Sequence, residues 1–195
     1  MAAIVISYML NEVQPKTASL LISEPFMLDP NFKRSVVLLA EHNEEGTIGY
    51  VLNQKSDFVL SDVIAECADA SFPIYIGGPV GNDSLHFLHR CYDRMNSGTE
   101  IGKGIYWGGN FETLKLLISN KQVQENEIRF FVGYSGWDIG QLAGELVQNS
   151  WLVTNQYNPD FIFTEEEENL WKDIVIGLGP KYAHIVNFPE NPMWN

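Results

Sequence analysis

The chain has 195 residues, of which 45% are hydrophobic and 12% aromatic. A chain of this length and composition can bury a core without disulfides or metal clips, so we expect a single domain over residues 1–195. Twelve Lys and Arg against 25 Asp and Glu leave a formal net charge of −13 at pH 7. A field of that sign repels phosphate backbones and anionic lipid surfaces, which argues against direct nucleic-acid binding and against membrane binding.

The acidity is distributed along the chain. Residues 1–129 carry 10 basic and 16 acidic side chains, and residues 130–195 carry 2 and 9. The first 15 residues lack the basic start of a secretory signal, and no run approaches the roughly 18 apolar residues of a membrane span. Cys67 and Cys91 are therefore expected to be reduced thiols, and we predict a cytoplasmic protein.

Short apolar runs rich in β-branched residues predict strands in the first half of the chain. A polar turn over 41–46 joins two of these runs and predicts a hairpin. Ser61 is expected to cap a short helix, and Pro73 to precede the next strand. The predicted strands are Ala18–Ile22, Ser35–Ala40, Thr47–Leu52, Ile74–Ile76 and Leu85–His89, and the predicted helix is Asp62–Cys67.

The second half alternates strand and helix signals. Asn110 can cap the first of its helices, and Thr164 with Glu167 forms a capping-box pattern before an acidic helix over about 164–177. Strand–helix units of this kind favour parallel crossovers, whereas the short early connections favour antiparallel pairs, so we expect a mixed sheet. The predicted strands are Ile105–Trp107, Glu127–Tyr134 and the edge strand Trp151–Thr154; the other predicted helices are Phe111–Ser119 and Gln141–Gln148.

The segment Gly133–Trp137 places a serine between a strand and a helix, as a nucleophile elbow does. The position two after that serine normally has to be small, and here it is Trp137, so Ser135 is expected to be a turn residue. His86 and His89, three apart in a strand, would point to opposite faces and not share a metal ion. We therefore predict no catalytic residues, no metal site and no cofactor, and we lean against an enzyme.

Ligand-binding candidates lie where predicted strands end in glycine-containing loops. Gly77 and Gly78 could approach a phosphate, although Pro79 removes a donor and a tight turn explains them as well. The loop over 135–140 ends a strand and precedes a helix, with Trp137 offering an aromatic surface. Six residues are the candidates: Asn53, Gly77, Gly78, Gly136, Trp137 and Gln141.

Several motifs in order along residues 17–154 resemble the YqgE/AlgH family. They are Pro25–Phe32, Ser35–Leu39, Glu41–Asn43, Gly46, Gly49–Asn53, Gly77–Val80, Gly133–Trp137, Gly140–Leu142, Glu145 and Trp151. The resemblance implies a bacterial cytosolic protein of α+β (mixed α/β) class, with a coiled mixed, largely antiparallel β-sheet and flanking helices. Family members are often labelled transcriptional regulators, and the family brings no agreed catalytic residues; its usual motif has Ala where this chain has Ser135.

The leading hypothesis is a non-catalytic binding or regulatory protein that acts through a protein partner or a small ligand. The alternative is a small-molecule or nucleotide-binding enzyme with its site where Asn53 and the loops at 77–80 and 135–140 converge. That alternative requires the three segments to be neighbours and Trp137 to lie outside the core. A third hypothesis is a structural oligomerisation domain, which a large apolar surface patch would mark.

Overall fold

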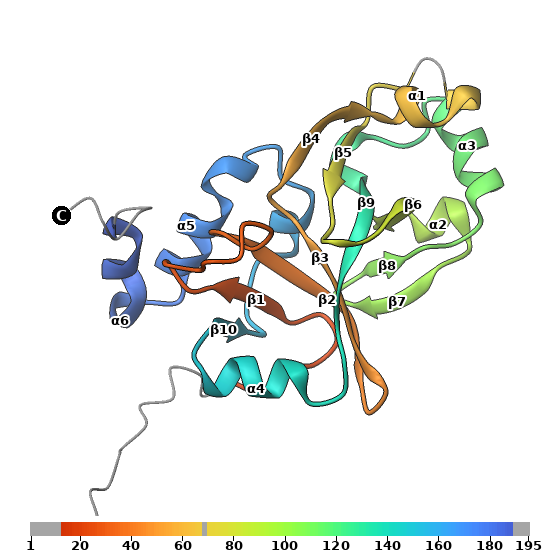
Figure 1. The fold of residues 1–195 in the computed structure, drawn as a ribbon. Helices are drawn as coiled ribbons and strands as arrows, with labels where there is room; N and C mark the ends of the chain where they lie inside the picture. The colour runs from red at the N-terminus through yellow and green to blue at the C-terminus, as the bar shows by residue number, and fades with distance from the viewer. Residues whose placement is uncertain (1–12, 68–69, 189–195) are drawn as a thin grey trace, which may run out of the picture.

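The computed structural model describes residues 13–67 and 70–188 (Figure 1). The strands are β1 (Leu20–Ser23), β2 (Val36–Asn43), β3 (Gly46–Val51), β4 (Lys55–Val59), β5 (Pro73–Ile76), β6 (Val80–His89), β7 (Thr99–Gly102), β8 (Ile105–Trp107), β9 (Ile128–Trp137) and β10 (Trp151–Thr154). The α-helices are α1 (Leu60–Val63), α2 (Tyr92–Met95), α3 (Phe111–Ser119), α4 (Gln141–Val147), α5 (Glu167–Gly177) and α6 (Pro180–Ala183). The 3-10 helices are η1 (Ala65–Cys67), η2 (Glu125–Glu127), η3 (Pro159–Phe163) and η4 (His184–Asn187). Within the described ranges, no helix is long and apolar enough to cross a bilayer.

The strands form one open, mixed sheet in the order β10-β1-β2-β3-β9-β6-β8-β7, with β5 pairing beside β9 and β4 beside β5. Only β5 and β9 pair in parallel among the described strands. The predicted mixed, largely antiparallel sheet with flanking helices is therefore confirmed, as are the β2–β3 hairpin and the edge strand β10. The expected parallel crossovers are confirmed in strand direction. Strands β8 and β9, joined through α3, are both antiparallel to β6 and so run parallel, and the four antiparallel pairs from β9 to β10 make these two strands parallel as well. In neither case are the two strands adjacent in the sheet.

Helices cover the sheet at three places (Figure 1). Leu170 and Trp171 of α5 pack on one face, in the cluster that contains Tyr50 and Phe131. Leu114 of α3 packs with strands β5, β6 and β9 in a second cluster, and α4 covers a third cluster built on β1, β2 and β10. The three cores lie along a single sheet, so the sheet is the element that positions every surface described below.

Three sequence predictions about local structure need correction. Ser61 does not cap a helix: α1 begins at Leu60, whose fully buried side chain anchors it, and the backbone N–H of Val59 donates to the Asp62 carboxylate. Thr164 and Glu167 form no capping box, because Glu167 is buried and its carboxylate lies 3.4 Å from Lys55. The predicted loop at 135–140 is partly strand, since β9 continues to Trp137.

Strand β9 joins the two parts of the sheet. Its first residues pair with β6 and β5, and its last three pair with β3. At the changeover Gly133 has φ +69°, and a Cβ on Gly77 would lie 2.3 Å from the Gly133 carbonyl oxygen. A Cβ on Gly78 would lie 2.4 Å from the Ser135 nitrogen. The glycines of two motifs thus allow backbones to pack in direct contact.

Replacing Gly77 with alanine is expected to lower the free energy of unfolding by about 2–3 kcal/mol, because the added methyl meets backbone that cannot move aside. Gly144 in α4 is the matched control: nothing lies within 4 Å of its added Cβ, so Gly144→Ala should raise stability by roughly 0.5–1 kcal/mol. Urea unfolding of both variants measures the difference. Equal effects of the two substitutions would contradict the close approach at Gly77.

Candidate ligand-binding groove

Asn53, the first candidate, follows β3 and is committed to the backbone. Its Oδ1 accepts from the Val36 N–H at 2.9 Å, and its Nδ2 donates to the Arg34 carbonyl at 2.9 Å. The amide therefore ties the end of β3 to the start of β2. These two hydrogen bonds account for an asparagine at this position, so no ligand contact is needed to explain Asn53.

Gly77 and Gly78 form the close junction with β9 described above. The Gly77 carbonyl accepts from the Val51 N–H at 2.9 Å and from the Ser135 hydroxyl at 3.0 Å, and the Gly77 N–H donates to the Val132 carbonyl at 2.9 Å. Both backbone groups of Gly77 are thus engaged within the fold. Ser135 is fully buried, so its hydroxyl fixes this junction.

Trp137 is 5% exposed and packs in the core beneath α4. Its ring lies edge-on to that of Trp151, with centroids 5.9 Å apart. Both indole N–H groups donate to one oxygen of Glu145, at 2.8 Å from Trp137 and 2.7 Å from Trp151, while the other oxygen accepts from Gln141. Buried indole N–H groups need such partners. The indole of Trp137 is thus taken up by the core and does not present an open aromatic surface.

The described residues nevertheless form an open groove of about 520 Å³ at the end of the β2–β3 hairpin, where β9 ends. Three of the six sequence candidates line it: Gly136, Trp137 and Gln141. Asn53, Gly77 and Gly78 do not. The remaining lining residues are Glu41, Asn43, Glu45, Gly46, Thr47, Ile48, Val80, Tyr134 and Asp138.

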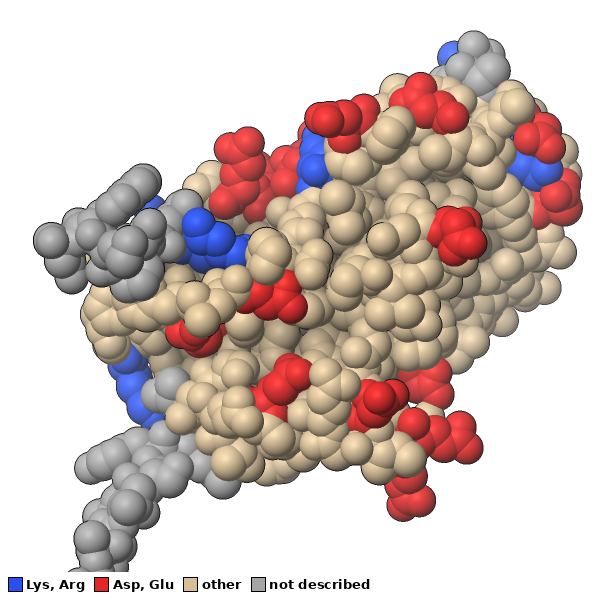
Figure 2. Space-filling model, in the orientation of Figure 1, with Lys and Arg blue, Asp and Glu red and all other residues tan. Residues whose placement is uncertain are grey.

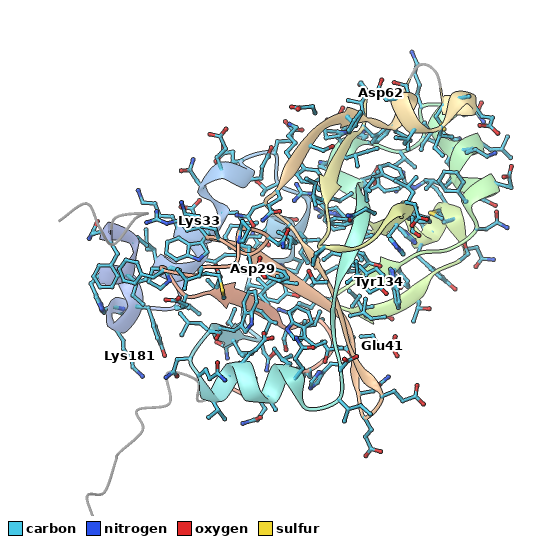
Figure 3. The ribbon with its side chains drawn as sticks, in the orientation of Figure 1. Asp29, Lys33, Glu41, Asp62, Tyr134 and Lys181 are labelled. Carbon is cyan, nitrogen blue, oxygen red and sulfur yellow. The ribbon has the colours of Figure 1, made fainter. Side chains whose placement is uncertain are left out.

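Tyr134 is the half-buried aromatic residue of the groove, which Glu41 also lines (Figure 3). A Cβ on Gly136 would lie 3.3 Å from the Tyr134 ring and one on Gly81 would lie 3.2 Å from it, so two glycines make room for the ring. Gly133 directs it there, because a positive φ inside a strand shifts the alternation of side chains. In a regular strand, Phe131 and Tyr134 would point to opposite faces, because they are three residues apart.

Three carboxylates surround the groove: those of Glu41, Glu45 and Asp138. None of them takes part in a salt bridge among residues 13–67 and 70–188. Glu41 accepts from the Asn43 amide at 2.6 Å. The groove is therefore an acidic, hydrogen-bond-accepting surface with one aromatic ring at its edge.

Behind Tyr134 lie the rings of His86 and Tyr50. Tyr50 is fully buried, with its ring centroid 6.3 Å from that of Trp107, and Nε2 of His86 has no hydrogen-bond partner among the described residues. The Tyr50 and His86 rings lie 5.5 Å apart, and the His86 ring meets Tyr134 edge-on at 5.8 Å. Burial raises the pKa of Tyr50 and lowers that of His86, so both are neutral near pH 7.

Cys91 and His89 form a structural pair. Cys91 is fully buried with its Sγ 3.6 Å from His89 Nδ1, and His89 Nε2 lies 3.1 Å from the Gly108 carbonyl. An Nε2–H imidazole satisfies both contacts, donating to Gly108 and accepting from the thiol. Burial raises the pKa of Cys91 and lowers that of His89, which favours the neutral pair over thiolate and imidazolium. No group of three or more His, Cys, Asp or Glu side chains among the described residues could hold a metal ion.

Sequence reasoning missed Tyr134 and the three carboxylates. Tyr134 stands inside the motif Gly133–Trp137, but strand periodicity makes it the last residue of a buried strand. The detectable signal is Gly133, since an internal strand glycine often marks a bulge that redirects the next side chain. The acids on the hairpin carry no such signal, because charged turn residues are common.

Comparison with known proteins matches residues 20–183 to a family model described as AlgH-like. The chain is 39% identical to a UPF0301 protein of Chlorobaculum tepidum, covering 92% of this chain and 96% of that one, and 41% identical to one of Parabacteroides distasonis, covering 95% and 94%. The solution structure of the AlgH protein from Pseudomonas aeruginosa superposes with a TM-score of 0.69 at 29% identity, covering 91% of this chain and 97% of that chain. A crystal structure of a Corynebacterium diphtheriae protein gives 0.72 at 26% identity, covering 90% and 94%.

Glu145→Ala is expected to lower the free energy of unfolding by about 2–4 kcal/mol, because it leaves two buried indole N–H groups without an acceptor. Glu145→Gln keeps a carbonyl acceptor and should cost less. The control is Glu112→Ala on α3, whose 79% exposed side chain pairs with Lys115 and should change stability by less than roughly 0.5 kcal/mol. Urea unfolding measures all three, and a Glu145→Ala loss no larger than the control's would contradict the role of Glu145.

The buried histidines predict a loss of stability in mild acid. Because burial lowers the pKa of His86 and His89, the folded chain binds fewer protons than the unfolded chain below the ordinary histidine value of about 6.5. Their contribution is complete above that pH and is lost as the pH falls below it. Unfolding free energies at pH 7.5 and 5.5 should show the decline, and His86→Phe should reduce it. An NMR titration placing the His86 pKa at or above 6.5 would contradict this.

Proposed function

The chain belongs to the AlgH-like family, and on that premise we propose that it is a non-catalytic regulatory protein that binds a protein partner in the groove beside Tyr134. The proposal rests on the way the segment Gly133–Trp137 divides its residues between the core and the groove. Ser135 and Trp137 point into the fold and are buried, whereas Gly136 is exposed and lines the groove with Tyr134. The same segment thus builds the core with one face and a recognition surface with the other.

Regulation of transcription through a protein contact is consistent with the charge of the molecule. Acidic side chains are spread over the face shown in Figure 2, and basic ones are few. The groove itself carries three carboxylates, a surface that repels phosphate. A protein partner with basic character fits such a surface, and we propose that regulation proceeds through this partner rather than through direct contact with DNA.

The enzyme alternative receives less support. Gly136 and Gln141 reach the groove, but Asn53, Gly77 and Gly78 are engaged in backbone contacts elsewhere. A site formed jointly by Asn53 and the loops at 77–80 and 135–140 therefore lacks a common opening among the described residues. Small-molecule binding in the groove is the alternative to a protein partner, and a ligand screen would reveal it.

Photocrosslinking tests the proposal. A crosslinking amino acid at Ile139, which is 76% exposed beside Asp138, should capture a discrete partner in cells. The control position is Leu116 on α3, which is 65% exposed at a distance from the groove (Figure 1) and should not capture it. Identical patterns at both positions would contradict the proposal. So would a salt-sensitive, sequence-specific complex of the purified chain with DNA, or a thermal shift with metabolites together with no crosslink at Ile139.

A further inference from the structure

A second cavity lies on another side of the molecule from the groove. It opens where α6 and η4 meet the loop after β1 and the residues between α4 and β10, and its volume of about 500 Å³ is in the range of small-molecule sites. Lys181, at this cavity, lies well apart from Tyr134 and Glu41 of the groove (Figure 3). No described residue lines both sites. We infer that this cavity binds a free α-amino acid with a large apolar side chain, a role separate from the partner binding proposed above.

Apolar and aromatic side chains form one wall of the cavity. Pro25 and Ile185 are buried there, and the rings of Phe26 and Phe188 stack with their centroids 5.4 Å apart. The His184 ring meets that of Phe188 edge-on at 5.7 Å. Phe188 is 37% exposed, so this wall is open to solvent. An apolar side chain that covers the wall gains hydrophobic contacts, and an aromatic one also gains ring–ring contacts.

Glu24 and Lys181 bring opposite charges to the same cavity. Glu24 is half-buried, and its Oε2 accepts from the Phe26 N–H at 3.1 Å, which holds the carboxylate beside the aromatic wall. The Lys181 ammonium lies 5.2 Å from the centre of the Tyr182 ring. Among the described residues no salt bridge joins Glu24 to Lys181, so the two charges act at separate points of the cavity.

An α-amino acid matches this arrangement group by group. Its ammonium can donate to the Glu24 carboxylate, and its carboxylate can accept from Lys181 and from the His184 imidazole. Its side chain starts from the same carbon and can lie on the wall formed by Phe26 and Phe188. Hydrogen bonds between charged groups are stronger than those between neutral groups, so both ends of the ligand contribute to affinity.

Other classes of ligand use only part of the cavity. A ligand with a single negative charge faces Glu24, and one with a single positive charge faces Lys181, so each meets a charge of its own sign. A residue inside a polypeptide has neither charge, because its amino and carboxyl groups are part of amide bonds. An amino acid with a small side chain leaves the aromatic wall in water, and one with a charged side chain buries that charge against apolar rings. A free amino acid with a large apolar side chain satisfies all three features.

Isothermal titration calorimetry of the full chain tests the inference with four probes. L-phenylalanine carries all three groups, 3-phenylpropanoate lacks the ammonium, 2-phenylethylamine lacks the carboxylate, and glycine lacks the side chain. L-phenylalanine should bind, and each of the other three should bind at least about tenfold more weakly. Binding of 3-phenylpropanoate or 2-phenylethylamine as tight as that of L-phenylalanine would overturn the inference, as would no binding of L-phenylalanine at millimolar concentration.

Two charge variants assign the two ends of the ligand. Glu24→Gln keeps an oxygen for the Phe26 N–H and should weaken L-phenylalanine at least about tenfold while leaving the weaker binding of 3-phenylpropanoate undiminished. Lys181→Gln should weaken L-phenylalanine to a similar extent and leave 2-phenylethylamine undiminished. The matched controls are Glu44→Gln and Lys172→Gln, exposed side chains that do not line the cavity and should change affinity less than about twofold. Loss of all probes in both cavity variants would indicate damage to the fold and overturn the assignment of the two charges.

The position of the ligand separates this inference from the proposed function. In NMR spectra of the labelled chain, L-phenylalanine should shift the amides of Phe26, Ser150 and His184 and leave those of Tyr134 and Gly136 in place. Shifts at Tyr134 and Gly136 in place of the other three would put the amino acid in the groove and overturn the inference. If Ile139 captures a partner in cells while L-phenylalanine does not bind, only the inference fails. If L-phenylalanine binds in the cavity and the crosslink is absent, only the proposed function fails.

Discussion

The fold depends on the direct contact of backbones where Gly77 and Gly78 meet β9 at Gly133 and Ser135. A methyl group on Gly77 would lie 2.3 Å from a carbonyl oxygen, so only hydrogen fits there. This contact lets one strand, β9, pair first with β5 and β6 and then with β3. Without it the sheet would have no continuous path between its two parts.

The same contact determines what the groove can present. The positive φ of Gly133 shifts the alternation of β9, so that Tyr134 emerges on the face of Phe131 and stands over Gly136. Ser135, two residues beyond Gly133, faces inward, and its hydroxyl donates a hydrogen bond to the Gly77 carbonyl. The arrangement of buried and exposed residues in this motif is thus a consequence of one glycine conformation.

The buried side chain of Arg129 makes a second set of contacts that hold the sheet together. Arg129 is 3% exposed and donates to the Leu52 carbonyl at 2.7 Å and to the Thr164 carbonyl, and its guanidinium stacks on Tyr75 at 4.1 Å. It joins β9 to the end of β3 and to the segment before α5. A buried cation needs all of these partners. Arg129 thereby attaches the start of α5 to β9, the strand whose end lines the groove.

Sequence patterns predict the strands whose apolar residues face a core, including β2, β3, β5, β8 and β10. They miss β4 and β7, whose side chains are largely exposed, and the first half of β6, where Gly81, Asn82 and Asp83 resemble a loop. The family resemblance is confirmed by the match over residues 20–183. Sequence also points to Gly136 and Gln141, but the surroundings of Tyr134 depend on the conformation of Gly133 and on a hairpin that meets it in space, which no local pattern encodes.

NMR chemical-shift mapping of the labelled chain with a basic peptide addresses recognition in the groove most directly. Binding there should shift the backbone amides of Gly46, Tyr134, Gly136 and Asp138, which line the groove, together with the His86 ring behind Tyr134. The amides of α3 should stay in place. Shifts confined to α3 or to the C-terminal helices, with the groove amides unchanged at saturating peptide, would contradict recognition of a basic partner in this groove.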